Sequence, residues 1–171
     1  MLSPRKDARR PAVRTTGETA AVAECTASAV AELSIRNRLD ELGRASAWLA
    51  RFADSLALPA ETVFRLDLGL TEAVSNIIAY AYPDAAEHEI LLRLQAHPEG
   101  VSLEIEDDGR PFDPLRAERP PLPASLEEAP IGGLGIHLIR SMLDECHYRR
   151  EAGKNRLTML AKRRATDESR P

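Results

Sequence analysis

Residues 60–82 constrain the fold most, because their apolar side chains recur at steps of three and four. These side chains are Val63, Leu66, Leu70, Val74, Ile77 and Ala81. In an α-helix this spacing forms one stripe, and such a stripe is stable only when it is buried against another layer. Pro59 suits the start of this helix, and Pro83 stops it. The segment therefore predicts a long helix whose apolar side belongs to the core.

The segments around this helix indicate a sheet and further helices. Residues 89–96 and 101–107 are expected to be strands, and the link His97-Pro98-Glu99-Gly100 is typical of a hairpin turn. Other strands are expected at 32–37, 145–150 and 156–162, the last two joined at Gly153, and helices at 39–56 and 134–143. This order predicts an α+β fold, a two-layer sandwich with helices on one face of the sheet.

The composition fits one folded domain. A chain of 171 residues with 43% apolar residues can bury one core. The net charge of −4 argues against nucleic-acid binding through bulk positive charge, and no apolar run is long enough to span a membrane. Two cysteines and four scattered histidines show no metal-ligand spacing. We expect a cytoplasmic domain at residues 32–163, a disordered extension at 1–31 and a flexible tail at 164–171.

A first candidate site lies on the long helix. Glu72 and Asn76 are four residues apart, so their side chains share one face. The carboxylate can position a hydroxyl, and the amide oxygen can bind magnesium, which keeps water and phosphates as its other ligands. Such pairs also occur on solvated helix faces, and that interpretation stays open. Gly69 is unusual inside a helix and either permits close packing or leaves space for a ligand.

A second candidate lies at the end of the strand 101–107. Asp107 is followed by Asp108 and Gly109, which is also the composition of an ordinary turn. If Asp107 points into a pocket, its carboxylate can accept a hydrogen bond from an exocyclic amine such as that of adenine. Gly109 would then let a flat ring lie close to the backbone, because glycine has no Cβ.

A third candidate is rich in glycine. Gly132, Gly133 and Gly135 precede and enter the apolar helix 134–143. Backbone N–H groups and the helix dipole at such a position bind phosphate well. The Lys-Ser/Thr pair of a P-loop is missing. The alternative is a flexible hinge before the helix.

The three motifs together resemble the GHKL ATP-binding superfamily. Glu72-x-x-x-Asn76 is similar to its N box, Asp107-x-Gly109 to its G1 box, and Gly132-Gly-Leu-Gly135 to its G2 box. The resemblance covers residues 33–162 and is closest to bacterial anti-sigma factor serine/threonine kinases, through residues 70–82 and 133–145. It implies the Bergerat, or histidine kinase-like ATPase, type of sandwich with a mixed, mostly antiparallel sheet. Sensor histidine kinases place a dimerising helical hairpin upstream, which residues 1–31 lack.

The resemblance also implies roles for residues. Asn76 would hold magnesium between the phosphates of ATP, and Glu72 would be the general base for a serine hydroxyl of a protein substrate. Asp107 would bind adenine, and Gly109 would make room for it. The triphosphate would lie along the G2 box, which is Gly132, Gly133, Leu134 and Gly135.

Other positions around these boxes are less clearly matched. Residues 112–131 would form a lid over ATP. Tyr80 and Tyr82, after the N box, are expected to pack rather than to stack on the base. Many relatives carry a Gly-Thr pair before the last strand, whereas Gly153 and Thr158 are separated here, so a site role for Thr158 stays open.

The function implied by the resemblance is that of a cytoplasmic, ATP-dependent serine/threonine kinase. It would phosphorylate an anti-sigma antagonist of the STAS type and bind a sigma factor, without binding nucleic acid directly and without a membrane. The relatives suggest a homodimer through the first strand and helix. Two alternatives stay open: a non-catalytic ATP-binding switch or interaction module of the same fold, and a structural domain that binds no nucleotide.

Overall fold

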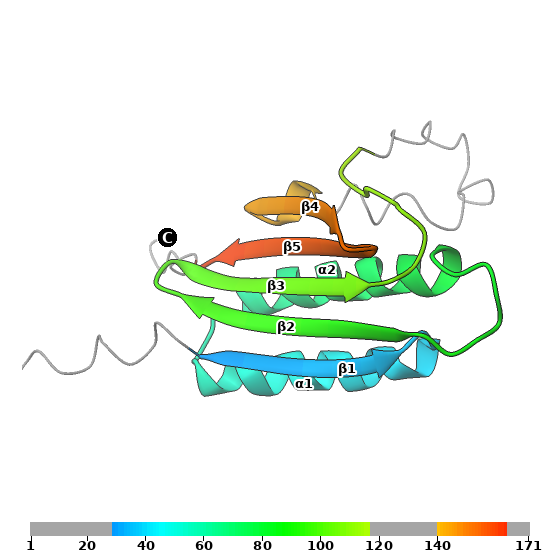
Figure 1. Ribbon diagram of the computed structural model, residues 1–171. Helices are drawn as coiled ribbons and strands as arrows, with labels where there is room; N and C mark the ends of the chain where they lie inside the picture. The colour runs from blue at the N-terminus through cyan, green and yellow to red at the C-terminus, as the bar shows by residue number, and fades with distance from the viewer. Residues whose placement is uncertain (1–28, 117–139, 164–171) are drawn as a thin grey trace, which may run out of the picture.

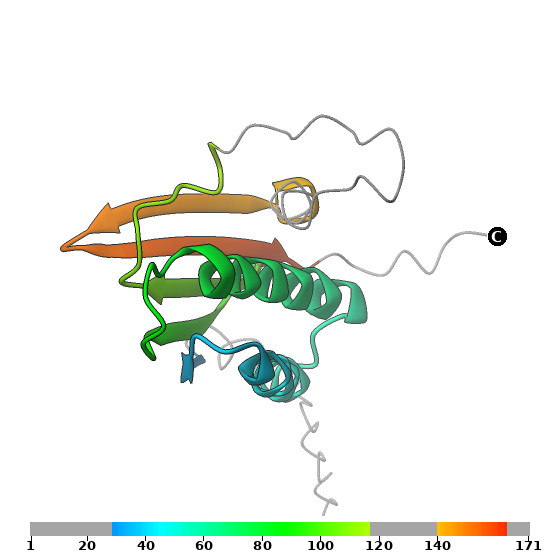
Figure 2. The same cartoon turned by 90° about the vertical axis from the view of Figure 1, so that its right-hand side faces the viewer.

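The computed structural model describes residues 29–116 and 140–163. It has two layers, a five-stranded sheet and helices that cover one of its faces (Figures 1 and 2). The elements are β1 (Val30–Arg36), the short 3-10 helix η1 (Leu39–Glu41), α1 (Leu42–Ser55), α2 (Ala60–Tyr80), β2 (Glu89–His97), β3 (Gly100–Asp107), β4 (Glu145–Glu151) and β5 (Lys154–Lys162). Of the predicted helix 134–143, residues 140–142 are helical, Leu143 lies in a bend after them, and residues 134–139 lie outside the described residues. The predicted α+β sandwich is confirmed.

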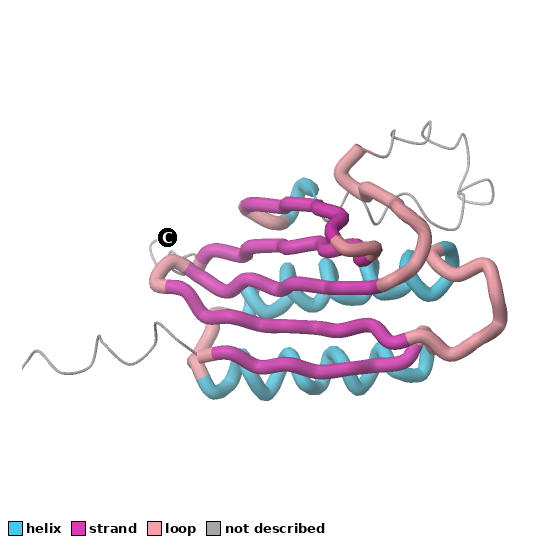
Figure 3. The backbone as a smooth tube through the Cα atoms, in the orientation of Figure 1, coloured by secondary structure: helices cyan, strands magenta, loops and turns pink. Residues whose placement is uncertain are grey.

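The sheet has the order β1-β2-β3-β5-β4 (Figure 3). All four pairings among the described strands are antiparallel, so the sheet shows none of the parallel pairing that a mixed sheet would have. The β2–β3 and β4–β5 pairs are hairpins, whereas β3 and β5 are distant in sequence and pair in the middle of the sheet. This pairing sets Asp107 opposite Asn155.

The core lies between the sheet and the helices. In β2 the alternate residues Ile90, Leu92 and Leu94 are fully buried. From α2 the buried members of the predicted stripe are Leu66, Leu70 and Val74, with Val63 and Ile77 partly buried at its edge, and Ala81 is buried directly after the helix. The helical and strand periodicities therefore identify the two surfaces that pack together. Within the described residues, neither helix combines the length and hydrophobicity that a bilayer crossing requires.

Several element boundaries differ by one to three residues from the sequence prediction, and two of these differences have identifiable reasons. Ala152 and Gly153 both have positive φ, 50° and 83°. Positive φ at both central residues makes a two-residue hairpin turn that matches the twist of the strands. Pairing thus begins directly at Glu151 and Lys154, and β5 starts two residues earlier than predicted. Helix α2 ends at Tyr80, because the carbonyl of Ala81 accepts a hydrogen bond from the Arg110 N–H at 2.9 Å instead of continuing the helix.

The side of α2 that carries Arg65 and Gly69 is also buried. A Cβ added to Gly69 would lie 3.0 Å from Leu143 Cδ1, so this glycine permits close packing, one of its two expected roles. Nearby, the side chain of Arg65 is only 2% exposed and donates to Asp144 Oδ2 at 2.7 Å and to the carbonyl of Lys162 at 2.7 Å. Arg65 thereby ties α2 to β5 and to the segment that leads into β4.

Candidate active site

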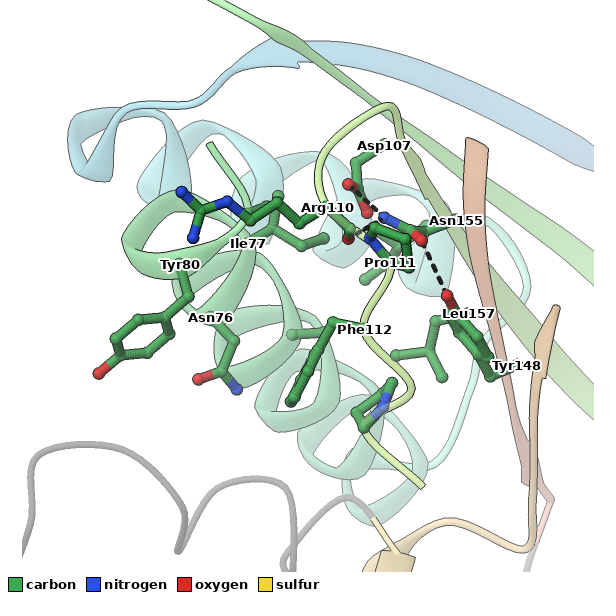
Figure 4. Close-up of a pocket in the computed structure, with 14 residues that line it drawn as sticks. Asn76, Ile77, Tyr80, Asp107, Arg110, Pro111, Phe112, Tyr148, Asn155 and Leu157 are labelled. Carbon is green, nitrogen blue, oxygen red and sulfur yellow. Dashed lines mark hydrogen bonds between the residues drawn. The ribbon is translucent and has the colours of Figure 1, made fainter. Parts of the chain in front are cut away.

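A cavity of about 180 Å³ opens between the C-terminal half of α2, the ends of β3 to β5 and the loop after β3. Figure 4 shows Asn76 and Tyr80 projecting from α2 on one side and Asp107, Asn155 and Tyr148 on the other. The lining residues are Ala73, Asn76, Ile77, Tyr80, Ala81, Ile105, Asp107, Arg110, Pro111, Phe112, Pro114, Tyr148, Asn155 and Leu157. Most of the lining is apolar, with a few polar groups, as is usual for a small-molecule site.

Asp107 is the buried carboxylate of this cavity. Its residue surface is only 5% exposed. Its Oδ1 accepts hydrogen bonds from the Gly109 N–H and from Asn155 Nδ2, each at 2.8 Å. Its Oδ2 has no hydrogen-bond partner among the described residues. Burial raises the pKa of this carboxyl group, and the hydrogen bonds from Asn155 and Gly109 oppose the rise. The carboxylate therefore has one oxygen left for a ligand.

Gly109 packs against the end of α2. A Cβ at this position would lie 2.6 Å from Ala81 Cβ and 2.9 Å from the Ala81 carbonyl oxygen. Gly109 is not among the residues that line the cavity. Glycine is therefore required here because the chain packs closely against Ala81. The sequence prediction instead explains this glycine by the approach of an adenine ring. The same contact, with the Arg110–Ala81 hydrogen bond, holds the loop after β3 against α2.

Replacing Gly109 by Ala is therefore expected to destabilise the folded state by about 1–3 kcal/mol, the usual cost of overpacking. The matched control is Gly43→Ala, because nothing lies within 4 Å of a Cβ at Gly43 in helix α1. That control should leave stability unchanged or raise it by up to about 1 kcal/mol. Urea unfolding measures both. A Gly109→Ala protein of wild-type stability would contradict the packing role.

Asn76 and Glu72 share one face of α2. Asn76 is half-buried and lines the cavity. Glu72, one turn earlier, is also half-buried but does not line it. A single amide oxygen at the edge of a cavity fits magnesium, because this ion takes few protein ligands and completes its shell with water and phosphate. Asn76 and Asp107, which the sequence placed 31 residues apart, are thus brought to one cavity.

The remaining predicted site residues are described only in part. Gly132, Gly133, Leu134 and Gly135 lie outside the described residues. Of the predicted lid at 112–131, residues 112–116 are described, and both Phe112 and Pro114 line the cavity. Phe112 is 49% exposed and lines the cavity, so it lies at the mouth of the cavity.

Tyr80, Tyr82 and Thr158 lie in three different environments. Tyr82 packs as predicted, since its ring stacks on His88 with centroids 3.9 Å apart. The prediction for Tyr80 is wrong: its side chain is 60% exposed and lines the cavity, because it follows Asn76 by one helical turn and shares its face. Thr158 does not line the cavity. It faces the open side of the sheet, where its hydroxyl donates to Glu104 at 3.3 Å.

Sequence reasoning missed Asn155 and Tyr148. Asn155 is 5% exposed, and its Nδ2 donates to Asp107, while Tyr148 donates to Asn155 Oδ1 at 2.8 Å. The alternation in β5 could have indicated Asn155, because it shares a sheet face with the buried residues Leu157 and Met159. A polar residue on a buried strand face needs a partner, which is itself a signal.

A model of the histidine kinase-like ATPase domain matches residues 35–161. The chain belongs to this family. The matched range takes in most of both described segments and the positions of the three motifs, so the resemblance seen in the sequence is confirmed. An ATPase family implies nucleotide binding, and the cavity that Asn76 and Asp107 line is a candidate place for it.

Similar proteins carry regulatory names. The chain is 37% identical over 114 residues to the serine/threonine-protein kinase BtrW of Bordetella bronchiseptica, covering 67% of this chain and 80% of that protein. It is 25% identical to the serine-protein kinase RsbW of Oceanobacillus iheyensis, covering 80% and 88%. It is 24% identical to an anti-sigma F factor of Thermoanaerobacter sp. strain X514, covering 80% and 95%. Family members similar to this chain are thus named as kinases and as an anti-sigma factor.

A solved structure supports the fold. The crystal structure of the RsbU and RsbW domains of Rv1364c from Mycobacterium tuberculosis matches with a TM-score of 0.55 and 14% identity. The match covers 80% of this chain and 33% of that longer one. At this identity the likeness concerns the fold alone.

Proposed function

We propose that this protein is an ATP-dependent serine/threonine kinase that acts as an anti-sigma regulatory factor in the cytoplasm. The observation that carries the proposal is that Asn76 and Asp107 line one cavity, with Glu72 one helical turn from Asn76. The relatives' names support the kinase class, and they do not favour a non-catalytic switch.

In this proposal the cavity binds the base and ribose end of ATP. Asp107 Oδ2 accepts a hydrogen bond from the exocyclic amine, and the apolar walls, such as Ile77 and Leu157, contact the ring. Asn76 holds magnesium, which neutralises charge on the phosphates when it is bound. The G2 box, from Gly132 to Gly135, supplies backbone N–H groups to the triphosphate.

Phosphoryl transfer then depends mainly on positioning and charge. Glu72 accepts the proton of a serine hydroxyl on the protein substrate, and the oxygen of that serine forms a bond to the γ-phosphorus of ATP. The bond from that phosphorus to the oxygen bridging it to the β-phosphate breaks, and ADP leaves. The substrate is an anti-sigma antagonist of the STAS type, and the second partner is a sigma factor. A homodimer through β1 and α1 stays a prediction, as do the domain limits 32–163.

The direct test is incubation with γ-labelled ATP, magnesium and candidate antagonist proteins. Label on a serine or threonine of one antagonist is the expected result. Mass spectrometry identifies the modified residue. Labelled antagonist should appear with the wild-type protein and not with heat-denatured protein. Absence of transfer to every candidate, despite nucleotide binding, would favour the non-catalytic switch.

Asn76→Ala is expected to remove the magnesium dependence of nucleotide binding. The loss of one ligand to the ion should weaken ATP affinity in magnesium about tenfold, and leave affinity in EDTA unchanged. Isothermal titration in the two buffers measures this. The control is Ser75→Ala, which removes a polar side chain about 100° further around the same helix. If Asn76→Ala lowers the unfolding temperature sharply while the folded protein keeps its nucleotide affinity, Asn76 is structural.

A further inference from the structure

Three side chains of the β4–β5 hairpin form a hydrogen-bond network behind Asp107, in which Asn155 bonds to Asp107 and both Tyr148 and Arg150 bond to Asn155. Asn155 of β5 donates from Nδ2 to Asp107 Oδ1 at 2.8 Å. Asn155 Oδ1 accepts from Tyr148 Oη at 2.8 Å and from an Arg150 guanidinium N–H at 2.6 Å. The same guanidinium nitrogen donates to the Gly109 carbonyl at 3.0 Å. Figure 4 shows Asn155 between Asp107 and Tyr148.

This arrangement allows only one orientation of the Asn155 amide. Its Oδ1 meets two donors, so exchanging oxygen and nitrogen would set an NH₂ group against a hydroxyl and a guanidinium. The Nδ2 group meets acceptors, which are Asp107 Oδ1 and the Arg110 carbonyl at 3.0 Å. A buried amide with donors on one side and acceptors on the other has a fixed direction. Asn155 is therefore a donor toward Asp107.

The fixed amide makes the two oxygens of Asp107 different. Oδ1 receives both the Asn155 amide and the Gly109 N–H. Oδ2 receives no hydrogen bond from the described residues. Two donors on one oxygen also hold the carboxylate in one rotamer at the cavity wall. A ligand thus meets Oδ2 and can satisfy it only with a donor.

The donors also decide the charge of Asp107. Burial raises the pKa of this carboxyl group, which favours its neutral form. The hydrogen bond from Asn155 is the largest effect that lowers the pKa again, followed by the Gly109 N–H. The other titratable or charged groups that face Asp107 or its cavity are Asp108, Tyr80, Tyr82, Tyr148, Arg110 and Arg150. Loss of Asn155 would therefore let Asp107 protonate at higher pH and become a donor itself.

We propose that Asn155 is the positioning residue that keeps Asp107 a pure hydrogen-bond acceptor, and that it thereby sets a preference for a 6-amino purine over a 6-oxo purine. The proposal rests on the proposed nucleotide site and adds a specificity determinant to it. An amino group donates to Oδ2. A carbonyl oxygen can only accept, so it can pair with Oδ2 only when Asp107 carries a proton and donates it.

The test compares the binding of ATP and ITP to wild type and to Asn155→Leu, which has a similar size but no donor. Wild type is expected to prefer ATP, and the ATP-to-ITP affinity ratio should fall about tenfold or more in the variant, the usual effect of one hydrogen bond to a charged group. The loss of ATP affinity on acidification should also begin at higher pH in the variant. Tyr148→Phe removes one donor that orients Asn155. It should also lower the ATP-to-ITP affinity ratio, but by a smaller factor than Asn155→Leu.

The matched control is Thr158→Val on the same strand. It also removes one hydrogen bond to a carboxylate, that of Glu104, but on the opposite face of the sheet. The ATP-to-ITP affinity ratio of Thr158→Val and the pH dependence of its ATP affinity should match those of wild type. Thermal unfolding of the apo proteins shows whether any variant has lost its fold. Equal weakening of ATP and ITP in Asn155→Leu and Tyr148→Phe, with unchanged pH profiles, would overturn the role of Asn155. A wild-type protein that bound neither nucleotide would instead overturn the proposed site, and the role of Asn155 with it.

Discussion

Replacing Glu72 by Gln is expected to reduce phosphoryl transfer about 10²- to 10⁴-fold, the usual contribution of a positioned general base. Gln has nearly the same shape as Glu and cannot accept the proton of the substrate serine. Nucleotide affinity should stay at the wild-type value, because Glu72 does not line the cavity that Asn76 and Asp107 share. Single-turnover transfer of label from ATP to the antagonist measures the rate, and titration with ATP measures the affinity.

Glu61→Gln is the control for the loss of a negative charge on α2. Glu61 lies in the first turn of the helix, with its side chain 56% exposed, three turns from Glu72. Transfer by this variant should match wild type. If Glu72→Gln and wild type phosphorylate the antagonist equally fast, Glu72 is not the base. If Glu72→Gln lowers both the nucleotide affinity and the rate of phosphoryl transfer, Glu72 contributes to nucleotide binding.

Replacing Asp107 by Asn is expected to invert the nucleotide preference. The oxygen of the introduced amide has to accept the Gly109 N–H and Asn155 Nδ2, as Oδ1 of Asp107 does now. The NH₂ group of that amide then faces the ligand, where it opposes the amine of ATP and donates to the carbonyl of ITP. The ATP-to-ITP affinity ratio should change about 10³-fold, since one charged hydrogen bond is lost and one neutral bond is gained.

The stability of the apo protein separates this effect from misfolding. The Asp107→Asn change removes a buried charge, so the free energy of unfolding should not fall. Asp108→Asn is the matched control, because Asp108 is adjacent and its side chain is 59% exposed. It should leave the ATP-to-ITP ratio unchanged. If Asp107→Asn keeps the preference for ATP, the carboxylate does not contact the base.

Much of the fold follows from local patterns. The stripe in residues 60–82 predicts α2 and its buried side, and the hairpin turn at 97–100 predicts the pairing of β2 with β3. These patterns depend only on the residues of one helix or one hairpin. The three boxes likewise indicate the family, because each is a short motif. The predicted site residues Asn76 and Asp107 do meet at one cavity.

The surroundings of Asp107 could not be read in this way. Its partner Asn155 is 48 residues away and reaches it only because β3 pairs with β5. Gly109 is interpreted as space for a ligand until the contact with Ala81 is known. Tyr80 is expected to pack until the end of α2 is seen beside an open cavity. Periodicity reports which side of an element is apolar, and it carries no information about which other element lies there. The chain alone thus specifies the layers and the acceptor Asp107, whereas long-range strand pairing specifies the donor that orients this acceptor.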